Sequence, residues 1–196
     1  MNWGAGGGAM PLDRAKAFKE QGRLSALQKT GNSRAKDFGT EGNISEVTGT
    51  SIFDPVLCEI AYRWFSPVGG MVLDPFAGCS VRGIVAAKLG RRYIGIDLSG
   101  RQVEANRLQA GVILSVEDCQ TTWHIGDSLH IDKICRGVEA DFIFSCPPYA
   151  NLEVYSDDPA DLSTMEYSLF RQNYFEIIKK TCELLKDNRF ACFVVG

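Results

Sequence analysis

From residue 70 to the end of the chain, short apolar runs alternate with segments whose apolar residues recur at helical spacing. Strands that alternate with helices in this way form parallel sheets, because each helix carries the chain back to the edge where the previous strand began. The pattern predicts an α/β fold with a doubly wound, mostly parallel sheet and flanking helices. The expected strands are 71–73, 93–96, 122–125, 142–145 and 190–195, and the expected helices are 55–65, 81–89, 99–110 and 163–186.

Three local signals set the expected boundaries of two of these helices. Ser99 is placed to cap the third helix, and Gly111 is expected to end it. Ser163 and Glu166 have the spacing of a capping box for the last helix. The buried stripe expected on that helix consists of Phe170, Tyr174, Ile178, Cys182 and Leu185.

Three expected strands are followed by a carboxylate: Asp74, Asp97 and Asp127. Ligands of doubly wound sheets bind at the carboxyl ends of the strands, so these acids are candidates for one site. Asp97 lies 23 residues after Asp74, where a carboxylate accepts hydrogen bonds from ribose hydroxyls. At Gly126-Asp127-Ser128, a polar side chain is expected to meet an adenine edge. Taken one at a time, such an acid is more often a helix cap or a solvated loop residue, but three in succession, each at an expected strand end, are hard to assign to chance.

The turn after Asp74 restricts the ligand. Gly78 and Gly83 have the spacing of a phosphate-binding loop, but Ile84 and Val85 stand where Lys and Ser or Thr are required. Ser80 replaces the second glycine of a dinucleotide loop, and the preceding acid would repel a pyrophosphate. A ligand without phosphate, carrying a positively charged amino group and an adenosine, fits better.

A second turn, Ser145-Cys146-Pro147-Pro148-Tyr149, follows the apolar run 142–144. Proline lacks the donor that a central strand needs, so the strand must end here in a rigid turn. A stiff strand end with a free carbonyl and a flat ring suits a planar, amino-bearing group. A loop with a packing tyrosine is the alternative interpretation.

Together these motifs resemble the S-adenosylmethionine-dependent DNA methyltransferases that modify adenine N6 or cytosine N4, phage- and prophage-borne methylases among them. Asp-Pro-Phe-Ala-Gly at 74–78 resembles the family's cofactor motif, Ile-Gly-Ile-Asp at 94–97 its ribose motif, and 126–127 its adenine motif. Cys-Pro-Pro-Tyr at 146–149 stands where the family has Asp, Asn or Ser, then Pro-Pro and an aromatic. Residues 50–55 resemble the segment that closes over the methionine end of the cofactor.

The resemblance implies a Rossmann-like class I methyltransferase domain at 45–196, preceded by an arm or linker at 1–44. It implies S-adenosyl-L-methionine as cofactor and DNA as substrate, with RNA or an inactive, cofactor-binding remnant as alternatives. The implied catalytic residues are Cys146, Pro147, Pro148 and Tyr149. The implied cofactor-binding residues are Phe53, Asp74, Pro75, Phe76, Ala77, Gly78, Asp97, Leu98, Asp127 and Ser128.

The chain departs from the family pattern in three places. Cys146 is a weak acceptor, so the Pro147 carbonyl or Ser145 would have to assist; alternatively Cys146 is a covalent nucleophile or only packs. Cys79-Ser80 stands where Ser-Gly is common, which restricts backbone approach to the cofactor. The sequence stops at Gly196 without the family's C-terminal hairpin, so the sheet edge is expected to be covered by a missing segment or a partner chain.

Composition sets further limits. Residues 1–37 carry a net charge of +4 and residues 38–196 carry −7, so a basic arm could contact phosphates or simply be solvated. The acidic loop 153–161 is expected to be a solvated lid rather than a metal site. Seven scattered cysteines, two histidines and no long apolar run argue against zinc, disulfides and a membrane span, and favour a cytoplasmic setting.

Overall fold

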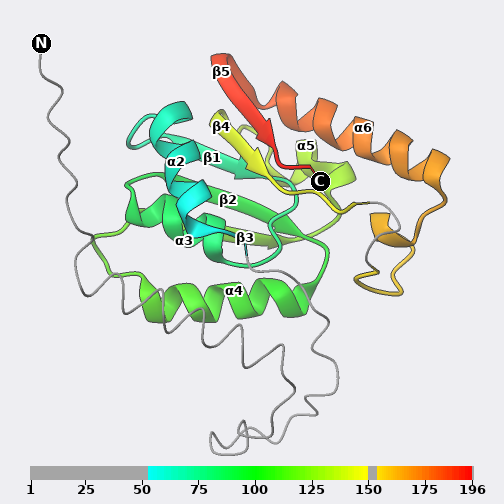
Figure 1. The fold of residues 1–196 in the computed structure, drawn as a ribbon, viewed down its shortest axis with the longest axis horizontal. Helices are drawn as coiled ribbons and strands as arrows, with labels where there is room; N and C mark the ends of the chain where they lie inside the picture. The colour runs from blue at the N-terminus through cyan, green and yellow to red at the C-terminus, as the bar shows by residue number, and fades with distance from the viewer. Residues whose placement is uncertain (1–52, 150–153, 196) are drawn as a thin grey trace, which may run out of the picture. The chain divides into compact units, whose positions relative to one another are not determined.

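The structure is a computed structural model that describes residues 53–149 and 154–195 (Figure 1). The expectations for residues 1–52, including the basic arm and residues 50–52, lie outside the described residues. The helices are α2 (Pro55–Phe65), α3 (Val81–Lys88), α4 (Gly100–Ile113), α5 (Ile131–Ile134) and α6 (Tyr167–Glu183), with short 3₁₀ turns at η3 (Ser128–His130) and η5 (Leu162–Thr164). The strands are β1 (Met71–Asp74), β2 (Arg92–Asp97), β3 (Thr121–Ile125), β4 (Ala140–Ser145) and β5 (Leu185–Phe193).

The five strands form one sheet in the order β3-β2-β1-β4-β5, and every pairing is parallel. The expected doubly wound α/β sheet is therefore confirmed. The chain moves from β1 outward to β2 and β3, then returns to the other side of β1 as β4. The direction reverses between β1 and β4, and the carboxyl ends of these two strands border the topological switch point where such sheets bind ligands.

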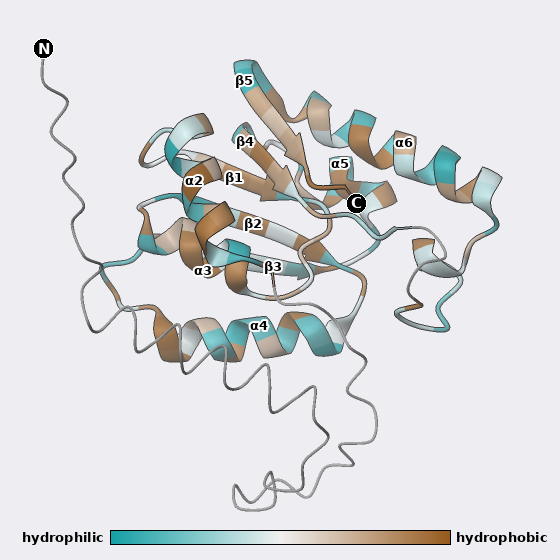
Figure 2. Cartoon of the chain, in the orientation of Figure 1, coloured by the Kyte–Doolittle hydropathy of each residue, from teal (hydrophilic) through white to brown (hydrophobic). Residues whose placement is uncertain are grey.

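Side chains that alternate along the central strands build two cores. Phe142 and Phe144 of β4 belong to a cluster with residues of α2, α3 and α4. Ile143, between them, belongs to a second cluster with Ile131 and Cys135 at α5. All six residues of β4 are buried, and the central strands are largely hydrophobic, whereas the helices carry hydrophilic residues as well (Figure 2).

Local sequence explains where α2 and α4 begin. The Asp54 side chain accepts from the Val56 N–H at 2.7 Å, and Pro55 occupies the first turn, where its missing N–H costs nothing. Ser99 caps α4 through the Gln102 N–H at 3.2 Å, as expected. The expected end of α4 was wrong: the helix passes through Gly111 to Ile113, because a glycine lowers helix stability without terminating the helix.

The last helix begins later than the capping box predicted. Ser163 lies in η5 with its side chain bonded to Asp161, and Glu166 caps α6 through the Ser168 N–H at 2.9 Å. Of the expected stripe, Phe170 is buried and Tyr174 and Ile178 are half-buried. The buried positions of α6 are Phe170, Ile177 and Thr181, while Cys182 is exposed and Leu185 already belongs to β5.

Strand β5 begins five residues earlier than expected and contains an irregularity. Leu185 pairs with Ala140 and Phe190 with Phe142, so β5 has three extra residues between these two pairs. Asn188 lies there with φ of 56°, a left-handed conformation that asparagine tolerates better than most residues. On either side of it, the side chains of Lys186 and Arg189 pair with Asp141 at 3.1 and 3.3 Å. Because this segment is polar and irregular, the pattern of apolar residues did not predict the start of the strand.

No helix in the described ranges is both long enough and apolar enough to cross a membrane.

Candidate active site

The loop between β1 and α3 (residues 75–80) follows Asp74, the last residue of β1, which is fully buried. Its Oδ2 accepts from the Arg82 Nε at 2.6 Å and from the Tyr93 hydroxyl at 2.7 Å. Its Oδ1 accepts from the Ser145 hydroxyl at 2.5 Å and from the Phe76 N–H at 3.1 Å. These four donors enclose the carboxylate beneath the loop, so its visible role is to hold the loop rather than to face a ligand.

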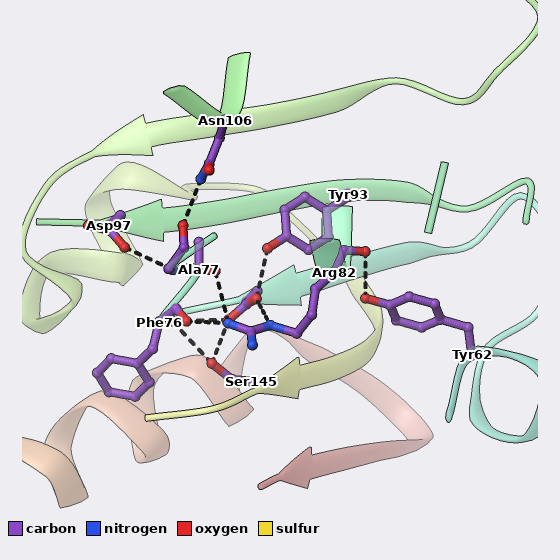
Figure 3. Close-up of polar contacts among 10 residues, drawn as sticks. Tyr62, Phe76, Ala77, Arg82, Tyr93, Asp97, Asn106 and Ser145 are labelled. Carbon is purple, nitrogen blue, oxygen red and sulfur yellow. Dashed lines mark hydrogen bonds and ion pairs between the residues drawn. The ribbon is translucent and has the colours of Figure 1, made fainter. Parts of the chain in front are cut away.

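Arg82 extends this network to the loop backbone (Figure 3). It is 3% exposed, and its second terminal nitrogen donates to the Phe76 and Ala77 carbonyls at 2.6 and 2.9 Å. Its guanidinium carbon lies 4.7 Å from the centroid of the Phe53 ring. Burial alone would lower the pKa of Arg82 and is the largest single cause. The adjacent Asp74 carboxylate raises it, and the net result is a raised pKa, so the guanidinium stays charged.

Glycine permits the bend at the centre of the loop. Gly78 has φ of 50°, and the space where a Cβ would stand is empty out to 4 Å. Its N–H donates to Asp97 Oδ2 at 2.8 Å, and its carbonyl accepts from the Asn106 side chain at 2.7 Å. The loop is therefore fixed by β2 and α4 on one side while Gly78 leaves open space beside the backbone.

The departure at Ser80 has a structural explanation. Ser80 has φ of −68° and ψ of −13°, an ordinary right-handed conformation that does not require glycine. Its hydroxyl contacts Gln109 Oε1 at 2.5 Å. Glycine is needed instead behind the loop, where a Cβ on Gly95 would lie 2.8 Å from the Ala77 Cβ and from the Tyr93 ring.

Asp97, at the end of β2, differs from Asp74 in its partners. Among the described residues, its two oxygens accept from backbone N–H groups alone, those of Gly78 and Ser99, both at 2.8 Å. Desolvation raises the pKa of Asp97 to about 6, and these two N–H bonds oppose the rise. A carboxylate with oxygen lone pairs left over and no cation bonded to it is suited to accept from the hydroxyls of a ligand.

Beyond β3, the expected adenine-binding residues divide into two kinds. Asp127 caps η3 through the Leu129 N–H at 2.8 Å and is half-buried. Ser128 is buried, and its hydroxyl donates to the Pro75 carbonyl at 2.5 Å. Ser128 thus braces the β1–α3 loop, whereas Asp127 and the half-buried Leu98 remain at the strand ends that a ligand would meet.

The turn 146–149 leaves β4 beside this loop. Cys146 is half-buried, and its Sγ lies 3.4 Å from the Tyr149 hydroxyl. Pro147 is buried, while Pro148 and Tyr149 are half-buried. Ser145, which immediately precedes the turn, is fully buried, and its hydroxyl donates to Asp74 and accepts from the Phe76 N–H. The hydroxyl is therefore engaged within the protein in this arrangement.

Aromatic rings connect α6 to the β1–α3 loop. The Tyr174 ring stacks on Phe76, with ring centroids 6.2 Å apart and an interplanar angle of 18°. Burial and, to a smaller extent, the electrostatic influence of the neighbouring Cys146 raise the pKa of Tyr174. Phe53 packs edge-on against Phe144 at 5.6 Å. The loop, the turn and α6 therefore meet around Phe76 and Cys146.

The structure brings together residues from the ends of β1, β2, β3 and β4, as the sequence indicated. Arg82, Tyr93 and Asn106 complete the site and were missed. The sequence contains an indication of the role of Arg82, because this charged residue lies within the apolar sequence that starts α3. Tyr93 and Asn106 have no such indication, since a strand tyrosine and a helical asparagine are common away from sites.

Two other features do not belong to this site. A hollow of about 480 Å³ between α4 and β3 is lined by residues of the range 107–123 and by none of the strand-end residues. Across the described residues, no three His, Cys, Asp or Glu side chains gather as metal ligands do.

Comparisons with known proteins give one family match and several similar folds. The family model described as DNA methylase matches residues 57–107, from α2 through the β1–α3 loop into α4. The matched family depends on S-adenosylmethionine, the cofactor expected from the sequence. No curated protein sequence matches the chain.

Among solved structures, TrmN from Thermus thermophilus is similar over 79% of this chain and 43% of its own, at 20% identity and a TM-score of 0.57. A putative rRNA methylase from Clostridium thermocellum is similar over 72% of both chains, at 14% identity and a TM-score of 0.53. Precorrin 8w decarboxylase from Methanobacterium thermoautotrophicum is similar over 75% of this chain and 66% of its own, at 11% identity and a TM-score of 0.52.

The chain spans less than half the length of the TrmN chain. At these identities the likenesses show the fold, and the decarboxylase illustrates that one fold serves different reactions. The chain therefore has the Rossmann-like fold of class I methyltransferases, and its residues 57–107 match the S-adenosylmethionine-dependent DNA methylase family.

Proposed function

We propose that this protein transfers a methyl group from S-adenosylmethionine to the exocyclic amino group of adenine or cytosine in DNA. The observation that carries the proposal is the junction of two strand ends. The β1–α3 loop and the turn 146–149 meet at the switch point of the sheet and are bonded to each other through Ser145. The first resembles the cofactor motif of amino-methyltransferases, and the second resembles their acceptor motif apart from Cys146.

The chain has groups that fit each part of the cofactor. Asp97 accepts from the ribose hydroxyls, and Asp127 and Leu98 border the adenine. The backbone at Gly78 allows close approach because no side chain fills the space beside it. Phe53 packs at the methionine end. When bound, S-adenosylmethionine supplies an electrophilic methyl group on a positively charged sulfur.

We assign a supporting role to Asp74, Pro75, Ala77 and Ser128, in place of direct contact through Asp74. The Asp74 carboxylate is enclosed by four donors, and contact with an ammonium group would require displacing at least one of them. Arg82 holds the Phe76 and Ala77 carbonyls inward. Their N–H groups are also fixed, so the loop presents a preformed backbone to the ligand.

An exocyclic amine of a base is a poor nucleophile, because its lone pair is delocalised into the ring. The acceptor turn would make the amine more reactive by orienting it. Hydrogen bonds from the amine to the Pro147 carbonyl and the Cys146 sulfur would orient the lone pair towards the methyl group. Tyr149 stacks on the base, which must first leave the duplex stack. Because a thiol accepts weakly, the Pro147 carbonyl carries most of this orientation.

A transfer assay tests the proposal. The full chain is incubated with methyl-tritiated S-adenosylmethionine and either unmethylated plasmid DNA or unmodified transcribed RNA. The expected result is label in DNA, reduced at least 100-fold in Tyr149→Ala. Label in RNA alone would contradict DNA as the substrate. Binding of S-adenosylhomocysteine by calorimetry, with no transfer to either polymer, would identify a cofactor-binding protein without this activity.

A further inference from the structure

The Ser145 side chain occupies a junction that its position in the sequence does not reveal. Ser145 is the last residue of β4 and is fully buried. Its hydroxyl donates to Asp74 Oδ1 at 2.5 Å and accepts from the Phe76 N–H at 3.1 Å. Its backbone carbonyl accepts from the Val194 N–H at 2.9 Å. One residue therefore contacts β1, the β1–α3 loop and the segment after β5.

The ladder between β1 and β4 ends before the site begins. The paired residues are Val72 with Phe142 and Leu73 with Ile143. Asp74 and Ser145 lie beyond these pairs, where the strand ends have no ladder to fix their separation. The side-chain bond between Ser145 and Asp74 continues the connection from that point.

The bond is also part of a stiff network. Asp74 accepts a hydrogen bond from Arg82, and Arg82 also donates to the Phe76 and Ala77 carbonyls. Ser145 is covalently joined to Cys146, the first residue of the acceptor turn. Movement of the turn relative to the loop must therefore break or stretch hydrogen bonds that are buried away from water, which is costly.

We propose that Ser145 is a positioning residue that fixes the acceptor turn 146–149 at the distance from the β1–α3 loop that methyl transfer requires. This inference rests on the proposed function. Rates of group transfer are sensitive to misplacement on the order of 1 Å. The loop keeps its bonds to Arg82, Asp97 and Asn106 without Ser145, so the rate of transfer should suffer more than cofactor binding.

The test separates rate from binding in Ser145→Ala. Tritiated methyl transfer to unmethylated plasmid DNA is measured at saturating S-adenosylmethionine, and the Kd of S-adenosylhomocysteine is measured by calorimetry. We expect kcat to fall about 10- to 100-fold, while Kd changes less than about 3-fold. An unchanged kcat, or a Kd that rises while kcat is kept, would overturn the proposal.

Ser163→Ala is a matched control for the loss of a buried serine. Ser163 is 3% exposed, donates to Asp161 Oδ1 at 2.7 Å and accepts from the Tyr155 N–H at 3.1 Å, which is the hydrogen-bond pattern of Ser145. The control is expected to keep kcat. An equal fall of kcat in both variants would assign the effect of Ser145→Ala to general loss of stability and overturn the proposal.

A second pair of variants covers the case in which Ser145→Ala does not fold. Ser145→Thr keeps the hydroxyl, whereas Ser145→Cys keeps the size but hydrogen-bonds weakly. We expect a higher kcat for Ser145→Thr, and equal values or the reverse order would overturn the proposal. Absence of transfer by the unmodified chain would instead overturn the proposed function, so the two failures are distinguishable.

Discussion

Asp74 and Asp97 end neighbouring parallel strands and look alike in the sequence, yet their surroundings differ. Asp74 is fully buried, with a guanidinium and two hydroxyl groups among its donors. Asp97 is half-buried, and within the part of the chain that the structure describes its side chain accepts only from two backbone N–H groups. A buried carboxylate that has a cation is part of the protein's framework. A desolvated carboxylate without a bonded cation is available to a ligand.

The largest effect is expected on the framework side, from Arg82→Met. This change leaves the Asp74 carboxylate buried without its cation, and removal of one partner of a buried pair lowers the free energy of unfolding by about 3–5 kcal/mol. The measurement is urea unfolding followed by circular dichroism. The double variant Arg82→Met/Asp74→Asn should recover much of the loss, because no buried charge is left unpaired. Additive losses in the double variant would contradict the pairing.

On the ligand side, Asp97→Asn should separate binding from stability. Hydrogen bonds to a charged acceptor contribute roughly 1.5–3 kcal/mol, so the Kd of S-adenosylhomocysteine is expected to rise about 10- to 100-fold. The free energy of unfolding of the ligand-free protein at pH 7.5 should change by less than about 1 kcal/mol. Removal of a desolvated charge offsets the loss of one of the two backbone N–H bonds, because an amide has a single acceptor oxygen. A large loss of stability with unchanged binding would make Asp97 a second framework residue.

The pH dependence follows from the raised pKa of Asp97. The folded pKa is about 6 and the ordinary value is 3.8, so the folded protein binds the proton more tightly than the unfolded chain. This contribution to stability is fully present below pH 3.8 and is lost as the pH rises through 6.

Ligand binding should show the opposite trend, because ribose hydroxyls donate to the ionised carboxylate. The affinity for S-adenosylhomocysteine is expected to rise about tenfold between pH 5 and pH 7 and then to level off. Calorimetry across this range measures it, with Asp97→Asn as the control that should lose the dependence. A flat profile in the unmodified protein would separate Asp97 from the ribose.

The smallest effect is expected at the ion pair between Lys88 and Asp118. The two atoms lie 2.6 Å apart, close to the separation in the Arg82–Asp74 pair, but the Lys88 side chain is 43% exposed. Solvent screening makes such pairs weak. Lys88→Ala should therefore leave the urea midpoint unchanged within error, and a clear shift would contradict the view that burial decides the strength of these pairs.

The sequence predicted the elements whose signals are local. Helix α2 has a capping aspartate, an early proline and apolar periodicity, and its bounds were predicted correctly. Strand β4 was found because its residues are apolar and two prolines follow it. The start of β5 was not found, because Lys186 and Arg189 enter the strand to pair with Asp141, which is 45 residues away along the chain from Lys186.

The same distinction applies to the site. Motif spacing placed Asp74, Asp97 and Cys146 at strand ends that the fold brings to one edge. Which acid faces a ligand depends on Arg82, Tyr93 and Ser145, and these contacts form only when α3, β2 and β4 pack together. Local sequence therefore indicated the kind of site, while tertiary contacts assigned the roles within it.

The central claim is that the turn 146–149 presents a base amine to a methyl donor, and the methylated nucleoside tests it most directly. DNA treated with the full chain and S-adenosylmethionine is digested to nucleosides and analysed by mass spectrometry against standards. The account predicts N6-methyl-2′-deoxyadenosine or N4-methyl-2′-deoxycytidine. Methylation at C5 of cytosine would contradict it, because that product requires a covalent nucleophile such as Cys146 in place of an oriented amine.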